Sequence, residues 1–493
     1  MLSYQANALI KIAVSSIRRN AVYNTFLSLS QVLVPVIVFP YVSRVLGPKG
    51  IGDIGFVDSF LQFAVLLAAL GIPIYGVREI AKTRHDRLRR SQLFSELLLL
   101  HFLSTFLISI FYWALFTYHP KLAIHHGLFV ISLGMMYMQV FMIEWLFQGV
   151  EAFSFITKRA LVFRLLSVVL IFSFVTEADD TLVYFLIIFL TGTSNMIVNI
   201  IYAKRYVELR FRGLDLARHL KPLFYIFSFG IVVSFYTVLD TALLGLLRDT
   251  SEVGYYSAAT RVVKLVLTVL TAFVLVAIPR LSVSFNSGDL PVVHHLLGKS
   301  FGYIALIGVP AAVGLMVYAN DLMMLFAGPE FVPAVAALRI MTASVLIIGL
   351  SNVFGMQILN PSNNERLFFR AALMGMLVSL AFNLTLIPYF GLYGTAITNV
   401  VTELTVLVLL IIYSARVIDF RPKWRKIGEA LLSCAPFIPV GMLIRPLHIH
   451  PLFGLSLAIG LSAVCYFVIQ HWVFRNQLVD ELKQQVLRKI GVT

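Results

Sequence analysis

The chain is dominated by long apolar runs, which constrain its fold more than any other feature. A helix needs about 20 mainly apolar residues to cross the hydrocarbon core of a bilayer. Of the 493 residues, 59% are apolar and only 13% are charged, whereas a typical soluble domain has about 25% charged residues. These runs predict an all-α polytopic membrane protein, and the composition excludes disordered, collagen-like and coiled-coil chains.

Fourteen runs are long enough to be membrane-spanning helices. Their approximate ranges are 21–46, 54–77, 93–117, 126–147, 160–175, 181–203, 222–247, 254–279, 300–319, 334–358, 367–387, 391–413, 428–444 and 452–473. Four prolines can kink their spans: Pro35 and Pro40 in the first, Pro73 in the second and Pro388 in the eleventh. The connecting loops are all short, so neither a soluble catalytic domain nor an ATP-binding domain has a segment to occupy. We therefore expect a protein that is not an enzyme.

The basic residues indicate how the chain lies in the membrane. With the N-terminus in the cytoplasm, most of the 39 Lys and Arg residues fall on the cytoplasmic side of the predicted spans. Basic residues accumulate in cytoplasmic loops of membrane proteins. We therefore expect both termini in the cytoplasm of a multi-pass protein of the cytoplasmic (inner) membrane. The same distribution accounts for most of the net charge of +15 without a nucleic-acid partner.

A short internal repeat suggests two related halves. The sequences GDIGF at 52–56 and GYYSA at 254–258 lie 202 residues apart, and each is expected at a turn between two spans. The offset equals six spans, so the halves would run parallel about an axis along the membrane normal. The expected parts are a cytoplasmic interfacial segment (1–20), an N-terminal lobe of helices 1–6 (21–221), a C-terminal lobe of helices 7–12 (222–426), helices 13–14 (427–473) and a cytoplasmic tail (474–493).

Three glycines, Gly50, Gly52 and Gly55, spell the GxGxxG fingerprint of dinucleotide-binding proteins. That motif works only after a strand and within a βαβ unit. Here it lies between two expected spans, so we predict a tight glycine-rich turn between helices. Walker A and HExxH motifs are missing from the sequence, and the loop histidines have no partner set. We therefore expect no metal site and no other cofactor.

Polar residues inside the spans indicate a substrate site. An ionisable side chain at a helix centre costs about 2.5–3.5 kcal/mol on insertion scales, so it should face a partner or a water-filled cavity. Arg261 and Lys264 lie one turn apart in the eighth span, and their mutual repulsion calls for an anion or water. The other candidate substrate-binding residues are Asn24, Gln31, Asp58, Gln62, Asp240 and Arg164.

Polar stripes on the first two spans of each half fit a water-filled central cavity between two lobes. The alternative is that these residues form interhelical hydrogen bonds or internal ion pairs, such as one between Asp58 and Lys264. Glu144 and Glu403 are open between structural pairing and function. Asp58, Asp240 and Glu403 are the carboxylates that could couple transport to a proton or Na⁺.

Five stretches together resemble one family across residues 20–475. They are PVIVFPYVSRVLGPKGIGDIG (35–55), ALGIPIYGVREIAKTRHDRLRR (69–90), EWLFQGVEAF (144–153), VGYYSAATR (253–261) and NLTLIPYFGLYGTAITNVVTE (383–403). They resemble bacterial polysaccharide repeat-unit flippases of the multidrug/oligosaccharidyl-lipid/polysaccharide exporter superfamily. Glu144 and Ile54 depart from the family's pattern, in which a shorter acidic residue and a tyrosine are common.

The resemblance implies two six-helix lobes around a V-shaped cavity, with two extra helices. It also implies the transfer of undecaprenyl-diphosphate-linked oligosaccharides to the outer leaflet for O-antigen or capsule synthesis, with a polysaccharide polymerase and a chain-length regulator nearby. Arg261 and Lys264 would then attract the diphosphate, with Arg261 as a bidentate clamp. Asn24, Gln31, Gln62 and Asp58 would hydrogen-bond sugar hydroxyls.

Other functions stay open on the sequence alone. A lipid II or teichoic-type flippase would share the mechanism but not the cargo. An ion-coupled multidrug exporter of the same superfamily would favour a cavity dominated by carboxylates, which Arg261 and Lys264 oppose. A membrane polymerase or glycosyltransferase would need a large catalytic loop that the sequence lacks, and a purely structural membrane scaffold is the last alternative.

Overall fold

The computed structural model describes residues 2–447 and 450–490. The side chains of residues 2–26, 28, 29, 32, 229, 233–237, 482 and 485–490 lie outside the described set. The described backbone contains helices and no strand, and ten of the described helical segments are long and apolar enough to cross a membrane. The prediction of an all-α multi-pass membrane protein is confirmed, whereas the number of fourteen spans stays a prediction.

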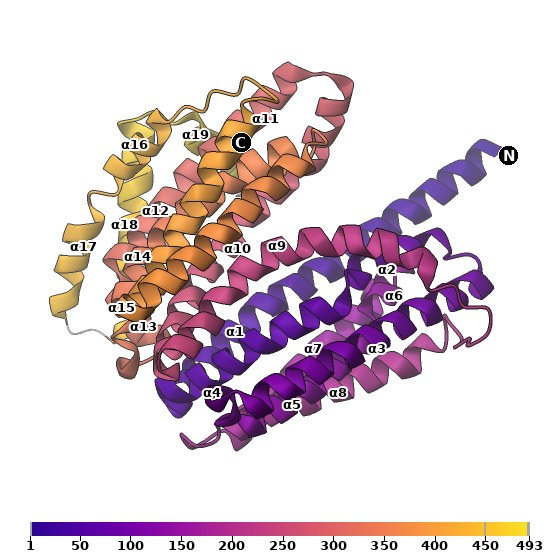
Figure 1. Ribbon diagram of the computed structural model, residues 1–493. Helices are drawn as coiled ribbons and strands as arrows, with labels where there is room; N and C mark the ends of the chain where they lie inside the picture. The colour runs from indigo at the N-terminus through magenta and orange to yellow at the C-terminus, as the bar shows by residue number, and fades with distance from the viewer. Residues whose placement is uncertain (1, 448–449, 491–493) are drawn as a thin grey trace. The chain divides into compact units, whose positions relative to one another are not determined.

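Contacts divide the chain into two compact units, residues 1–242 and 243–493. Helices α3, α5, α8 and α7 pack in that order in the first unit, and Figure 1 shows them running side by side. The helices are α1 (Leu2–Ala69), α2 (Ile72–Lys82), α3 (Arg87–Tyr118), α4 (Pro120–Ala123), α5 (His126–Val140), α6 (Glu144–Gly149), α7 (Phe153–Phe174), α8 (Thr181–Ala203) and α9 (Ala217–Leu247).

The boundary between the units falls inside α9, whereas the predicted lobes meet before that helix, at residues 221 and 222. Helix α1 continues without interruption through residues 2–20, the segment expected at the membrane interface. The interfacial segment and the lobe boundaries stay predictions.

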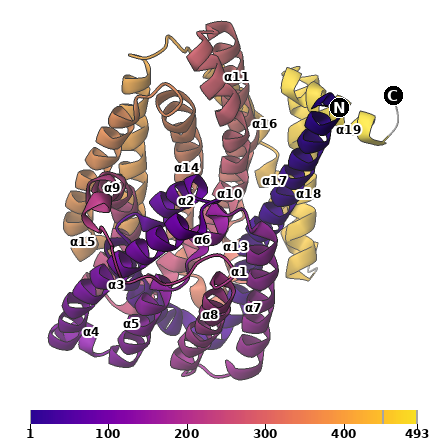
Figure 2. The ribbon, with the colours of Figure 1, turned by 90° about the vertical axis from the view of Figure 1, so that its right-hand side faces the viewer.

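The second unit is built around α14, which packs against both α10 and α15. Its helices are α10 (Thr250–Ser287), α11 (Leu290–Tyr303), η1 (Ile304–Gly308), α12 (Val309–Val317), α13 (Ala319–Phe326), η2 (Pro329–Phe331), α14 (Ala334–Asn352), η3 (Val353–Leu359), α15 (Glu365–Ser414), α16 (Arg425–Ser433), α17 (Phe437–Ile444), η4 (Arg445–Leu447), α18 (Pro451–Trp472) and α19 (Gln477–Ile490). Figure 2 shows α17 and α18 side by side. The buried hydroxyl of Tyr318 holds both, because it donates to the Phe437 carbonyl at 2.9 Å and lies 2.8 Å from the Ser462 hydroxyl.

The first turn of the chain lies at Gly47, within the predicted gap between the spans at 21–46 and 54–77, but the prediction that the GxGxxG glycines at 50–55 form this turn is wrong. Gly47 has φ 63°, a left-handed conformation that interrupts α1, and Pro48 follows it as the helix resumes. The three glycines of the GxGxxG sequence lie within the helix. Gly50 is buried there, and a Cβ at this position would lie 2.8 Å from Thr181 Oγ1. Gly50 therefore permits close packing of helices rather than a turn.

The second turn likewise lies in a predicted gap, between the spans at 222–247 and 254–279, and precedes the repeat motif. Helix α9 ends at Leu247 and α10 begins at Thr250, so the turn precedes the predicted 254–258. The Asp249 carboxylate caps α10 by accepting a hydrogen bond from Ser251 N at 2.8 Å. Gly47 and Asp249 are 202 residues apart, so the offset of the internal repeat is retained while each turn lies five residues before its repeat motif.

Two further interruptions agree with the sequence. Leu70 and Gly71 have positive φ, and α2 begins just before Pro73, so the chain breaks beside this proline. Helix α1, by contrast, runs through Pro35 and Pro40 with helical backbone angles. In the second unit, Gly391 interrupts the 50-residue α15 with φ 50° and ψ −125°. The predicted spans at 367–387 and 391–413 lie on the two sides of this break.

Candidate functional site

Arg261 and Lys264 lie on α10 in the second unit, and both side chains are exposed. Buried Ala258, Val262 and Val263 occupy the opposite face of the same turns. The helix therefore buries its apolar face in the second unit and presents both cations away from that core. Their role in substrate binding stays a prediction.

The candidate residues of α1 are only partly described. Gln62 Nε2 donates to Asp58 Oδ2 at 2.5 Å, one helical turn away, so the structure pairs these two side chains. Gln31 is exposed, and the side chain of Asn24 lies outside the described residues. Asp240 on α9 is buried, with 3% of its surface exposed.

Arg164 belongs to the first unit and connects α7 to α1. Its Nη1 donates to the Leu27 carbonyl at 3.1 Å and to the Ser30 hydroxyl. The half-buried guanidinium thus has backbone and hydroxyl partners that fix its position. Arg164 also contributes to the wall of a cavity inside the first unit.

This unit-1 cavity has a volume of about 530 Å³, and six helices contribute to it. Its polar lining residues are His101 of α3, Gln139 of α5, Glu144 and Gln148 of α6, Arg164 and Ser167 of α7, and Thr191 and Asn195 of α8. Trp145, Phe163 and Ile188 supply apolar surface. The cavity therefore combines hydrogen-bonding groups with flat apolar walls.

Two polar atoms of the lining have no hydrogen-bond partner among the described residues. They are His101 Nδ1 and Asn195 Oδ1, and both atoms are buried. The His101 side chain is the more enclosed, since only 5% of the residue surface is exposed. Buried polar groups are nearly always hydrogen-bonded to protein or water, so these two atoms are exceptions that lie beneath the cavity surface.

The carboxylate of Glu144 at the cavity is held by a buried cation. Arg159 Nη2 donates to Glu144 Oε1 at 2.5 Å, and the Arg159 side chain is 2% exposed. The Arg159 guanidinium also lies 5.4 Å from the ring centre of Phe155. Of the two interpretations left open for Glu144, the structure shows the pairing.

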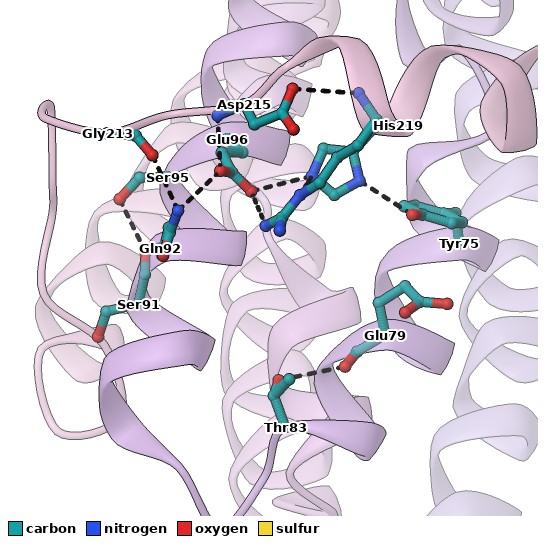
Figure 3. A network of polar contacts seen from close by, with 11 residues as sticks. Tyr75, Glu79, Thr83, Ser91, Gln92, Ser95, Glu96, Gly213, Asp215 and His219 are labelled. Atoms are coloured by element: carbon teal, nitrogen blue, oxygen red, sulfur yellow. Dashed lines mark hydrogen bonds and ion pairs between the residues drawn. The ribbon is translucent and has the colours of Figure 1, made fainter.

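A second polar cluster, the Glu96 network, ties α3 to the start of α9. Glu96 is fully buried, and its carboxylate accepts hydrogen bonds from Asp215 N at 2.9 Å and from the guanidinium of Arg218. Its Oε2 lies 2.9 Å from His219 Nε2, and His219 Nδ1 lies 2.9 Å from the Tyr75 hydroxyl of α2. Figure 3 shows the carboxylate between the Asp215 loop and the imidazole. The network fixes three segments of the first unit around one buried charge.

Of the residues that line the unit-1 cavity, the sequence pattern indicated only Arg164 as a candidate site residue and left Glu144 open between structural pairing and function. The available signal was weak, since His101, Gln139 and Asn195 are single polar residues within separate apolar runs. Nothing in their spacing shows that they meet. The Glu96 network gave a similar signal, one acidic residue near the start of a predicted span.

Comparisons with known proteins give the chain a family. The family described as "Polysaccharide biosynthesis protein" matches residues 17–285. A relative from Escherichia coli K12, named "Putative O-antigen transporter", is 25% identical over 404 residues, which cover 81% of this chain and 96% of that protein. A "Probable low-salt glycan biosynthesis flippase" of Haloferax volcanii is 23% identical over 256 residues, covering 51% of this chain and 52% of that protein.

Two groups of solved structures share the fold. A lipid II flippase in an inward closed conformation has a TM-score of 0.75 at 13% identity, covering 93% of this chain and all of that one. An outward-facing multidrug resistance transporter of the MATE family has a TM-score of 0.55 at 14% identity, covering 81% and 95%. These likenesses show the fold alone. Since the family match spans more than half of the sequence, this multi-pass membrane chain belongs to the polysaccharide biosynthesis protein family.

Proposed function

We propose that the chain is a flippase that moves undecaprenyl-diphosphate-linked oligosaccharide repeat units from the cytoplasmic to the outer leaflet. The cargo would serve the synthesis of O-antigen or capsule polysaccharide. The family match over residues 17–285 carries this proposal. It is supported by relatives that are named as a transporter and a flippase, and by the multi-pass helical fold.

The proposed mechanism uses the two cations of α10. The diphosphate of a lipid-linked glycan carries negative charge, while its polyprenyl tail can stay in the bilayer. Arg261 offers a planar fork of donors for phosphate oxygens and Lys264 a compact second charge. Alternating access would then expose the head group first to one side and then to the other. An inside-negative potential assists the outward step by about 2.3 kcal/mol per charge per 100 mV.

The remaining parts of the proposal concern placement and partners. We place the chain in the cytoplasmic membrane with both termini inside, because that orientation puts most basic residues in cytoplasmic loops. Two six-helix lobes would alternate around the cargo, and helices 13–14 would flank them. A polysaccharide polymerase and a chain-length regulator would act on the cargo after it crosses. The chain itself would carry out no covalent chemistry.

The test is complementation of cells that lack their own repeat-unit flippase, with surface glycan as the readout. The wild-type chain should restore the glycan. Arg261→Ala and Lys264→Ala should each reduce transport about tenfold or more, since a hydrogen bond to a charged group contributes about 1.5–3 kcal/mol. Arg261→Lys keeps the charge but not the fork, so we expect an intermediate rate.

The matched control is Arg280→Ala, which removes an exposed cation from the same helix. It should restore glycan as well as the wild type at equal membrane levels. Restoration by all four variants would leave the flippase function standing and remove Arg261 and Lys264 from the mechanism. A well-expressed wild-type chain that restores nothing would overturn the proposed cargo, and rescue of lipid II export in its place would identify the alternative.

A further inference from the structure

We propose that the unit-1 cavity is a saccharide-binding site that holds a mono- or disaccharide portion of the transported glycan. This inference rests on the proposed function for the source of the sugar, but the cavity itself belongs to the first unit. It is separate from the cation pair of α10, to which the diphosphate is assigned. The cavity would thus recognise the sugar part of the cargo.

The first support is the hydrogen-bonding capacity of the lining. His101 Nδ1 and Asn195 Oδ1 are buried without a partner in the described chain. Only 5% of the His101 surface is exposed. Asn195 lies on a different helix, α8. An orphaned acceptor or donor inside a protein is costly. Both atoms lie beneath the cavity surface, so a ligand with several hydroxyl groups would instead meet the more exposed lining amides, Gln139 of α5 and Gln148 of α6.

The second support is the charge balance of the cavity. The Glu144 carboxylate is already paired with Arg159, and Arg164 is bound to the Leu27 carbonyl and the Ser30 hydroxyl. The remaining polar lining is uncharged apart from the imidazole of His101, and consists of amide and hydroxyl side chains (Gln139, Gln148, Asn195, Ser167 and Thr191). Such groups suit hydroxyls and acetamido groups better than a diphosphate, which calls for cations that are not otherwise engaged.

The third support is size and surface. A volume of about 530 Å³ lies within the roughly 300–1,000 Å³ range of small-molecule sites. Trp145, Phe163 and Ile188 supply apolar walls against which the C–H faces of a sugar ring can pack. Trp145 is itself fixed, because its ring lies against Phe94 at 5.6 Å between centroids. The wall is therefore preorganised.

The test uses Trp145 as a reporter in the full-length purified protein. The other three tryptophans are removed as Trp113→Phe, Trp424→Phe and Trp472→Phe, so that the fluorescence reports on the cavity. The protein is titrated with glucose, galactose, N-acetylglucosamine and glucuronate, and with NaCl as the non-sugar probe. We expect a saturable change with at least one sugar and none with NaCl.

Two variants locate the response. Asn195→Leu should weaken the apparent affinity for the responding sugar about tenfold, the effect of a lost hydrogen bond to a bound ligand. Gln139→Leu changes an exposed residue of the lining, and it should weaken the affinity as well. The matched control is Ser194→Leu, an exposed neighbour on α8 outside the lining. It should leave the titration unchanged.

The outcomes separate this inference from the proposed function. Loss of response to every sugar, a response to NaCl alone, or equal titrations for both cavity variants and the control would overturn the saccharide site. Complementation by the wild type would still stand in those cases. Conversely, a sugar response that Asn195→Leu and Gln139→Leu weaken would support the site even where the wild type restores no surface glycan, and the failure would then lie with the cargo.

Discussion

Glu96→Ala is expected to destabilise the first unit by about 1–3 kcal/mol, the cost of leaving the buried hydrogen-bond partners of this carboxylate without their acceptor. The carboxylate is fully buried and accepts from Asp215 N and Arg218. It also lies within hydrogen-bond distance of His219, which is 2% exposed. Alanine would leave these groups without their acceptor and would release the start of α9 from α3. The measurement is the thermal unfolding midpoint of the purified protein in detergent, which should fall by several degrees.

The control for Glu96 is an exposed ion pair of the same unit. Glu208 lies 3.2 Å from Arg87, and both side chains are more than half exposed. Such pairs contribute about 0–1 kcal/mol, so Glu208→Ala should leave the midpoint nearly unchanged. Glu96→Gln keeps the shape but not the charge, and we expect a midpoint between those of the wild type and the alanine variant. Equal midpoints for Glu96→Ala and Glu208→Ala would show that the network does not stabilise the unit.

The membrane-spanning class could be predicted because its signal is local. The apolar run at 181–203 coincides with α8, and the run at 452–473 lies one residue from α18. In both cases polar or charged residues border a continuous apolar segment, and the length required by the bilayer fixes the helix. A membrane-spanning helix can therefore be recognised from its own sequence, without knowing which helices pack against it.

The turns were harder to predict, because a glycine can either allow a positive φ at a turn or allow two helices to pack closely. The GxGxxG sequence contains more glycines than the true turn, yet the break lies at Gly47. Gly50 serves packing instead, since a side chain there would clash with Thr181, which is distant in sequence. A single sequence shows that a glycine is present but does not show whether φ or a neighbouring helix requires it.

The candidate site also has one part that could be predicted from the sequence and one part that could not. The exposed stripe with Arg261 and Lys264 could be recognised, because one helix carries it at a spacing of one turn. The unit-1 cavity could not, because His101 and Asn195 come from different helices and each looks like an isolated polar residue. Packing alone brings them to one cavity, and the packing of six helices is not encoded in any one run of sequence.

Gly391→Ala is expected to destabilise the second unit by about 3 kcal/mol or more, combining two effects. Gly391 has φ 50° and ψ −125°, a conformation that costs a residue with a side chain about 1–3 kcal/mol. A Cβ there would also lie 2.1 Å from Glu252 Oε2, the oxygen that accepts a hydrogen bond from Leu392 N at 2.6 Å. Displacing that carboxylate removes a bond worth about 1.5–3 kcal/mol. The thermal unfolding midpoint is again the measurement.

A double-mutant cycle separates the two effects. In a Glu252→Ala background the steric conflict is gone, so Gly391→Ala should cost only the backbone strain of about 1–3 kcal/mol. Gly460→Ala in α18 is the control, because a Cβ there meets nothing within 4 Å, and a helical Gly→Ala change is neutral or stabilising by up to about 1 kcal/mol. Additive costs at positions 252 and 391 would mean that the carboxylate can move away freely. In that case φ alone, and not the contact from α10, would account for the glycine at the break in α15.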